Sequence, residues 1–197
     1  HVFLNRINEL AIEEIDHLYR IAEEADVTLM VRQAERYNPA LLSLSHYIKN
    51  PSFVEIAKNI HIPGQDAYAR DNLLTQVFEG LNVVMFKKKT NIKRIHVHLS
   101  SVFKEAPDLI HIRLEFDNGA TVNLSLSYMP GQPSFKVQYF QKDEILYVDL
   151  NSKQAIRKKV NKGSQVMFEE PLLVMNGSSI LDEMLVFAHA ILKTNAW

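Results

Sequence analysis

Alternating apolar and polar residues dominate the second half of the chain. Residues 109–116 (LIHIRLEF) and 120–129 (ATVNLSLSYM) both alternate with the period of two that is typical of a half-buried β-strand. Asp117-Asn118-Gly119 lies between them and predicts a tight hairpin turn, because Asn and Gly tolerate a positive φ. Further strands are expected at 53–58, 92–102, 135–140, 145–150 and 155–160. Together they predict an antiparallel meander of about six strands.

Apolar residues at helical spacing predict long helices at 12–25, 72–86 and from Ser178 or Ser179 to about residue 193. Asn38 before Pro39 predicts the start of a shorter helix running to about residue 48. The first helix lies between apolar segments 2–4 and 27–32, which gives a strand-helix-strand unit. We therefore expect an α+β fold, with this unit followed by a largely antiparallel open sheet that carries helices on one face.

The segment 144–150 (EILYVDL) is apolar on both sides of the predicted strand, unlike the hairpin. Helices that cover one face of the sheet would leave apolar side chains on the other. An exposed apolar face of this kind is typical of a subunit interface. We expect a homo-oligomer formed through this sheet face.

Composition narrows the class of protein. The chain has 197 residues, is 47% hydrophobic and carries a formal net charge of -1, which indicates an ordered globular protein and gives no reason to expect a nucleic-acid or membrane partner. The absence of cysteine excludes disulfides, thiol nucleophiles and thiolate metal sites, and fits a reducing compartment, so we expect a cytoplasmic protein. No apolar run approaches the ~20 residues that cross a bilayer. The first residue is His1 and no signal pattern follows, which indicates a fragment.

Four segments, taken in order, resemble one family of oxidoreductases. They are His1-Val2-Phe3-Leu4 with the helix ending IAEEADVTLMV, then Glu35-Arg36-Tyr37-Asn38-Pro39-Ala40, then the strand-Asp-Asn-Gly-Ala-strand hairpin, and finally a helix with Phe187-Ala188 and Ile191. This order resembles the glucose-fructose oxidoreductase / inositol dehydrogenase (Gfo/Idh/MocA) family. The resemblance implies that residues 1–32 end a dinucleotide-binding Rossmann domain and that residues 33–197 form an α+β domain for substrate binding and oligomerisation.

The same resemblance implies hydride transfer between NAD or NADP and a sugar or polyol-like small molecule. The chain contains no G-x-G-x-x-G loop, so the cofactor would be bound by an N-terminal domain that this sequence lacks. The Glu-Lys-Pro motif that follows the opening strand in the family is Asn5-Arg6-Ile7 here. Arg6 keeps the positive charge but does not release a proton near neutral pH.

The second catalytic motif of the family is also altered. It is an Asp followed four residues later by His and Asp, and its register on the helix 72–86 places Thr75, Glu79 and Gly80 at these positions, with Asn82 at a further frequent Asp. Glu79 is therefore the candidate base. The candidate substrate-binding residues are Arg6, Arg36, Tyr37, Thr75 and Asn82, and Arg6 is also the one candidate for a cofactor contact.

Two functions stay open. Either Glu79 serves as base with a raised pKa in an active enzyme, or the chain is a catalytically degenerate family member that acts as a binding or assembly subunit and Glu79 is a solvated carboxylate. His96, His98 and His111 on neighbouring strands have the geometry for zinc, but no carboxylate is fixed beside them. A polar sheet face or a subunit contact is therefore favoured for them, and no metal is expected.

Overall fold

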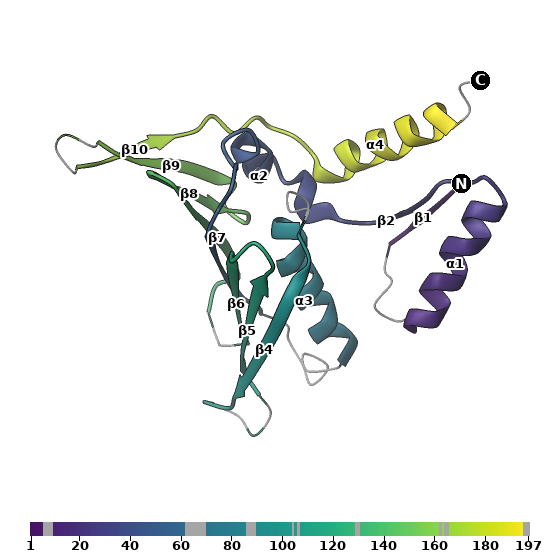
Figure 1. Ribbon diagram of the computed structural model, residues 1–197, viewed down its shortest axis with the longest axis horizontal. Helices are drawn as coiled ribbons and strands as arrows, with labels where there is room; N and C mark the ends of the chain where they lie inside the picture. Colours follow the sequence, from purple (N-terminus) through teal and green to yellow (C-terminus); the bar gives the residue numbers. More distant parts are fainter. Residues whose placement is uncertain are drawn as a thin grey trace.

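The computed structural model describes residues 1–5, 10–61, 70–85, 90–103, 105, 107–128, 131–161, 163 and 166–194. Its first part is the expected strand-helix-strand unit: β1 (Val2–Leu4) and β2 (Leu29–Val31) pair in parallel, and α1 (Ile12–Glu24) connects them. Its second part is one large sheet with helices beside it (Figure 1). The α+β fold class predicted from the alternation is confirmed.

The large sheet has eight strands in the order β10-β9-β8-β7-β3-β6-β5-β4, and all neighbours are antiparallel except β3 and β6. The strand bounds are β3 (Phe53–Asn59), β4 (Ile92–Ser100), β5 (Leu109–Phe116), β6 (Thr121–Ser127), β7 (Ser134–Gln141), β8 (Glu144–Asp149), β9 (Gln154–Val160) and β10 (Met167–Pro171).

Two details of the predicted sheet were wrong. The sheet has eight strands, whereas about six were expected. Its strands also do not follow one another as a simple meander, because β3 lies in the middle of the sheet between β6 and β7. Alternation identifies a strand but not its neighbours, and β3 reaches its parallel partner β6 only after α3, β4 and β5. Strand β10 was also not predicted, because all five of its residues are exposed and show no apolar alternation. It pairs antiparallel with β9, and ion pairs cross the two strands: Lys158 Nζ lies 2.6 Å from Glu169 Oε1 and Lys159 Nζ 3.1 Å from Glu170 Oε2.

The 3-10 turn η1 (Ala34–Tyr37), α2 (Pro39–Leu44) and α3 (Arg70–Met85) lie beside the sheet, whereas α4 (Ser179–Thr194) packs against η1 and extends away from the sheet (Figure 1). Asn38 caps α2 as expected, because its Oδ1 accepts a hydrogen bond of 3.0 Å from the Ala40 amide. The helix ends at Leu44 and not near residue 48, since the chain tightens there: the Tyr47 amide donates to the Leu44 carbonyl, three residues back.

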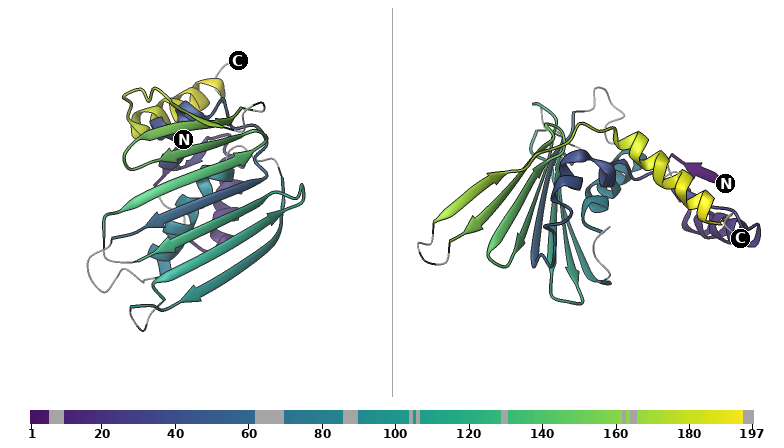
Figure 2. Two further views of the ribbon diagram at one scale, coloured as in Figure 1. Left: turned by 90° about the vertical axis from the view of Figure 1, so that its left-hand side faces the viewer. Right: turned by 90° about the horizontal axis from the view of Figure 1, so that it is seen from above.

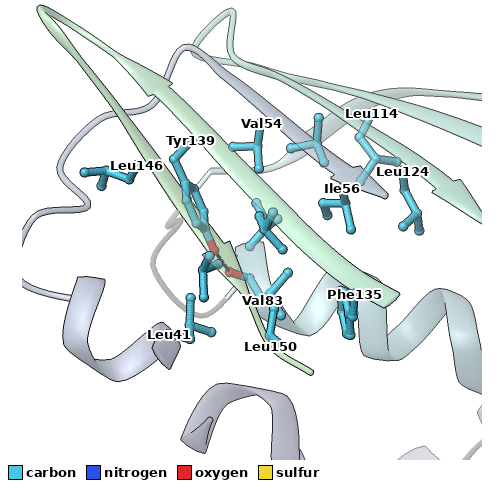
Figure 3. Close-up of a cluster of buried hydrophobic side chains, with 14 of the residues drawn as sticks. Leu41, Val54, Ile56, Val83, Leu114, Leu124, Phe135, Tyr139, Leu146 and Leu150 are labelled. Atoms are coloured by element: carbon cyan, nitrogen blue, oxygen red, sulfur yellow. Dashed lines mark hydrogen bonds between the residues drawn. The ribbon is translucent and has the colours of Figure 1, made fainter. Parts of the chain in front are cut away.

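One hydrophobic core lies between the sheet and its helices (Figure 3). Val54 and Ile56 of β3 are fully buried in it, together with Leu124 of β6. Gly80 lets α3 approach the sheet closely, because a Cβ added there would lie only 2.7 Å from Leu124 Cδ1. The core therefore fixes the position of α3, and of the polar side chains that α3 carries.

The opposite face of the large sheet carries none of the described helices (Figure 2). Phe53 and Phe140 lie next to each other on it, with ring centroids 5.4 Å apart. The β7–β8 pairing places Ile145 beside Phe140 and Tyr147 on the same face, and both are half-buried. Among the described helices, none combines the length and hydrophobicity required to span a bilayer.

Candidate functional site

One side of α3 brings together three of the residues predicted from the sequence. Thr75, Glu79 and Asn82 are spaced four and three residues apart, so they share a helix face. They line a hollow of about 240 Å³ between α3 and the segment that follows β2. Asn5, the residue directly after β1, lines the same hollow.

Glu79 does not stand alone in this hollow. It forms an ion pair with Lys58, whose side chain is only 11% exposed, whereas that of Glu79 is 32% exposed. The Lys58 Nζ also lies 4.6 Å from the ring centroid of Phe135, a cation-π distance. The ammonium of Lys58 is thus held between a carboxylate and an aromatic ring.

Glu35 of η1 is the third charged residue of the cluster. Burial raises the pKa of Glu35, and the nearby Glu79 carboxylate raises it further. Lys58, a backbone hydrogen bond and a side-chain hydrogen bond with Asn82 oppose this rise in pKa, but they do not cancel it. A carboxyl group with a raised pKa accepts and returns a proton closer to neutral pH than an ordinary glutamate.

A second, larger hollow of about 400 Å³ adjoins the first at Glu35 and Glu79. Its wall includes Lys58, Phe135 and several uncharged or weakly basic polar side chains: Asn38, Asn59, His61, Gln76, Ser134, Asn151 and Ser179. Amides and hydroxyls of this kind donate to and accept from the hydroxyl groups of a small polar molecule. The two carboxylates line both hollows, and the Lys58 ammonium that pairs with Glu79 belongs to the wall of the larger one.

Arg36 and Tyr37 have a different environment. Neither is among the described residues that line the two hollows. Burial lowers the pKa of Arg36, and the pKa of Tyr37 is raised first by burial and then by the negative charge of Glu183. Glu183 of α4 is almost fully buried and accepts a hydrogen bond from the Gln33 amide, so this cluster connects α4 to η1.

Arg6 lies outside the described residues, and its predicted contacts with substrate and cofactor stay a prediction. Its neighbour Asn5 accepts a hydrogen bond of 2.7 Å from Arg32 Nη1. Asn5 and Arg32 follow the parallel strands β1 and β2, and the carboxyl ends of parallel strands are the usual ligand-binding edge of an α/β sheet.

The three histidines of the open sheet face lie close to neighbouring side chains. His98 and His111 are cross-strand partners; His98 Nε2 lies 3.0 Å from Ser100 Oγ, and His111 Nδ1 lies 2.9 Å from Ser125 Oγ. His96 Nε2 lies 3.9 Å from the carboxylate of Glu115, a neighbour that the sequence did not indicate. In the described part of the chain, no group of three or more His, Cys, Asp or Glu residues has the arrangement needed to hold a metal ion.

Two residues of the site were missed by the sequence reasoning, although each had a signal. Lys58 follows Val54 and Ile56 at intervals of two, so it occupies an inward position of β3, where a charge needs a partner. Glu35 begins the segment Glu35–Ala40 that contributed to the family resemblance. Only the tertiary structure places both residues against Glu79.

Solved structures with the same architecture supply the comparison. UDP-N-acetylglucosamine 3-dehydrogenase GnnA from Acidithiobacillus ferrooxidans matches 98% of this chain and 62% of its own, with a TM-score of 0.85 and 18% sequence identity. This is the fold of the Gfo/Idh/MocA-type dehydrogenases. The dehydrogenase MviM from Clostridium difficile has it too, with a TM-score of 0.75 and 14% identity over 98% of this chain and 63% of its own.

The Gfo/Idh/MocA-type fold also occurs in a super-repressor mutant of Gal80p from Saccharomyces cerevisiae, which matches 95% of this chain and 58% of its own, with a TM-score of 0.71 and 15% identity. The chain spans about 60% of the length of these three structures. No family model matches the sequence. No curated protein matches it either.

Proposed function

We propose that this chain is the substrate-binding and oligomerising part of an NAD(P)-dependent oxidoreductase of the Gfo/Idh/MocA type, acting on a sugar or polyol-like molecule. The observation that carries the proposal is the convergence of Glu35, Lys58 and Glu79 at the junction of two polar hollows. Such a cluster can bind a hydroxyl group and exchange its proton, as alcohol oxidation requires. The cysteine-free sequence suits a reducing compartment such as the cytoplasm.

The residues present fit a nicotinamide beside the smaller hollow. Asn5 and Arg32 mark the carboxyl ends of two parallel strands, and both line this hollow together with Glu79. In the proposal, residues 1–32 belong to a dinucleotide-binding domain, the rest of which holds the cofactor, and residues 33–197 form the substrate wall. A bound nicotinamide supplies the hydride acceptor or donor.

The residues of this chain supply binding and proton transfer. Thr75 and Asn82 face the smaller hollow and would bind substrate hydroxyls beside the nicotinamide. Glu79 is the candidate base named from the sequence, and its ion pair with Lys58 makes proton exchange a property of the cluster with Glu35. Arg6, Arg36 and Tyr37 stay candidate substrate-binding residues by resemblance alone.

The test uses the full-length protein that contains this chain. NAD(H) and NADP(H) binding is measured by fluorescence titration, and turnover of a panel of sugars, polyols and their nucleotide conjugates is measured by nicotinamide absorbance. We expect binding of one cofactor, turnover of at least one sugar, and a loss of at least about 10-fold in kcat/KM for Glu79→Gln. Glu24→Gln, an exposed carboxylate of α1, is the matched control. A protein that neither binds nicotinamide nor turns over any of the panel would refute the proposal.

The alternative is a catalytically degenerate subunit that keeps the fold for binding or assembly. Two observations favour it: Glu79 is already occupied by Lys58, and a super-repressor mutant of Gal80p shares the fold. This alternative predicts a folded protein that binds a sugar or a partner without nicotinamide turnover. Isothermal titration of the sugar panel, read beside the absorbance assay, separates the two functions.

The uncovered face of the large sheet supports oligomerisation with a second copy of the chain. Phe53, Phe140, Ile145 and Tyr147 form an apolar band over β3, β7 and β8. It lies on the sheet face opposite the helices, whose arrangement Figure 2 shows. Burying such a band in a two-fold interface removes apolar area from water. Tyr147→Arg is expected to shift the sedimentation profile of the full-length protein toward monomer, whereas Tyr19→Arg on exposed α1 leaves it unchanged. A wild-type protein that is monomeric at high concentration would contradict the interface.

A further inference from the structure

We propose that Glu35 is the residue that exchanges a proton with the substrate hydroxyl, that Lys58 binds the oxygen of that hydroxyl, and that Glu79 is the positioning residue that holds Lys58. The inference rests on the proposed function and assigns roles within its cluster. It replaces the assignment of Glu79 as the base, which the motif register suggested.

The ion pair with Lys58 distinguishes Glu79 from Glu35, the other carboxylate of the cluster. Both glutamates line the two hollows, whereas Lys58 lines only the larger one and pairs with Glu79. Its segment η1 is fixed at the start, since the backbone amide of Gln33 donates to the buried carboxylate of Glu183. A carboxylate on a fixed turn between the two hollows can reach a hydroxyl that extends from one into the other.

The contacts of Lys58 and Glu79 indicate binding and positioning. The Lys58 ammonium forms an ion pair with Glu79 and a cation-π contact with the Phe135 ring, and Lys58 lines the larger hollow. An ammonium carries three donors, so one N–H can be directed to a ligand oxygen while the pair with Glu79 persists. Lys58 can therefore stabilise negative charge that develops on the substrate oxygen.

The charges around Glu35 suit reversible proton exchange. Burial and the Glu79 carboxylate raise the pKa of Glu35, while Lys58 and Asn82 favour the ionised form. Among the described residues, the helices packed against η1 carry further titratable groups: Asp182, Glu183 and His189 lie on α4, whereas α2 has no charged residue. His61 lines the larger hollow. The charged and titratable residues next to Glu35 in its own segment are Arg32, Arg36 and Tyr37.

The proposed step balances with a nicotinamide as the named co-reactant. In the oxidation direction the substrate O–H bond breaks and its proton moves to ionised Glu35. The C–H bond of the same carbon breaks, its electron pair leaves as hydride to oxidised nicotinamide, and the C–O bond becomes a carbonyl. In the reduction direction, protonated Glu35 returns the proton to the oxygen that accepts negative charge beside Lys58.

Kinetics of the full-length protein test these roles. We expect Glu35→Gln to lower kcat at least about 100-fold and to abolish the rise of kcat/KM with pH that reports ionisation of the base. Glu35→Asp is expected to keep part of the activity with a shifted pH profile. Glu79→Gln and Lys58→Met are expected mainly to raise KM, at least about 10-fold, and to keep the rise of kcat/KM with pH. Glu24→Gln is expected to change neither kcat nor KM.

Carbon-13 NMR of the carboxyl groups adds a readout that does not depend on turnover. We expect a carboxyl resonance that titrates above the ordinary glutamate range in the wild type and is missing in Glu35→Gln. The inference is overturned if Glu35→Gln keeps that resonance. It is also overturned if kcat/KM of Glu35→Gln still rises with pH as in the wild type, while kcat/KM of Glu79→Gln does not. A wild-type protein without cofactor binding or turnover refutes the proposed function and this role together, whereas an active wild type with an active Glu35→Gln refutes only the role of Glu35.

Discussion

Replacing Tyr139 with Phe is expected to destabilise the fold through the loss of one hydroxyl group. Tyr139 is 1% exposed in the core, and its hydroxyl donates a hydrogen bond of 2.7 Å to the Val83 carbonyl (Figure 3). Val83 lies near the end of the described part of α3 (Arg70–Met85), and its side chain is fully buried. Removing the hydroxyl takes this hydrogen bond away from a buried carbonyl.

The magnitude follows from this geometry. The ring of Phe fills the same space, so the cost is that of one buried hydrogen bond whose acceptor stays in the core, about 2 kcal/mol of unfolding free energy. For a chain of this size the midpoint of thermal unfolding should fall by about 4–8 °C. Burial raises the pKa of Tyr139 above its ordinary value of 10.0, so its stabilisation is complete below pH 10.0 and declines only as pH rises above that value.

Urea unfolding and calorimetry of Tyr139→Phe, with Tyr19→Phe as the exposed control, measure this difference. The difference should be constant between about pH 6 and pH 9, and hydrogen exchange should be faster at the end of α3. Equal stability of Tyr139→Phe and wild type would refute the reasoning that this buried hydrogen bond stabilises the fold. A strong pH dependence in that range would refute the role of a protonated phenol.

Three further substitutions test other parts of the structure. Asn38→Ala should lower the unfolding free energy by about 2 kcal/mol in urea, because it removes both the cap of α2 and a 3.0 Å hydrogen bond to a backbone carbonyl after β8. Glu35→Gln should raise the thermal midpoint, and by more at about pH 8 than at about pH 4, since a raised pKa means that stability is lost as the carboxyl ionises. Gly80→Ala should lower stability by up to about 2 kcal/mol, because overpacking against Leu124 outweighs the gain in helix propensity.

Each of the three has a matched control and a contradicting outcome. Asn50→Ala changes an exposed asparagine and should be neutral; an equal loss in both variants would contradict the capping argument. A gap between Glu35→Gln and wild type that shrinks as pH rises would contradict the raised pKa. Gly177→Ala meets only ordinary contacts of 3.5 Å, so a similar loss there would show that crowding by Leu124 is not the cause.

The candidate site was only partly predictable from the sequence. The helical spacing of Thr75, Glu79 and Asn82 was sufficient to place them on one face, and the structure confirms that they line one hollow. The partner of Glu79 was not predicted, because Lys58 is 21 residues away on another element and pairs with it only after β3 packs beside α3.

Local pattern by itself determined several elements of this protein: a period of two predicted the hairpin strands, and the Asn38-Pro39 pair predicted where α2 begins. These features depend on residues close in sequence, so the sequence alone was sufficient to locate them. Only the tertiary structure decided that β3 lies in the middle of the sheet, parallel to β6, and that β10 pairs with β9 at the edge, with ion pairs between the two strands. Strand neighbours and charge partners depend on packing between distant segments, which no short-range periodicity encodes.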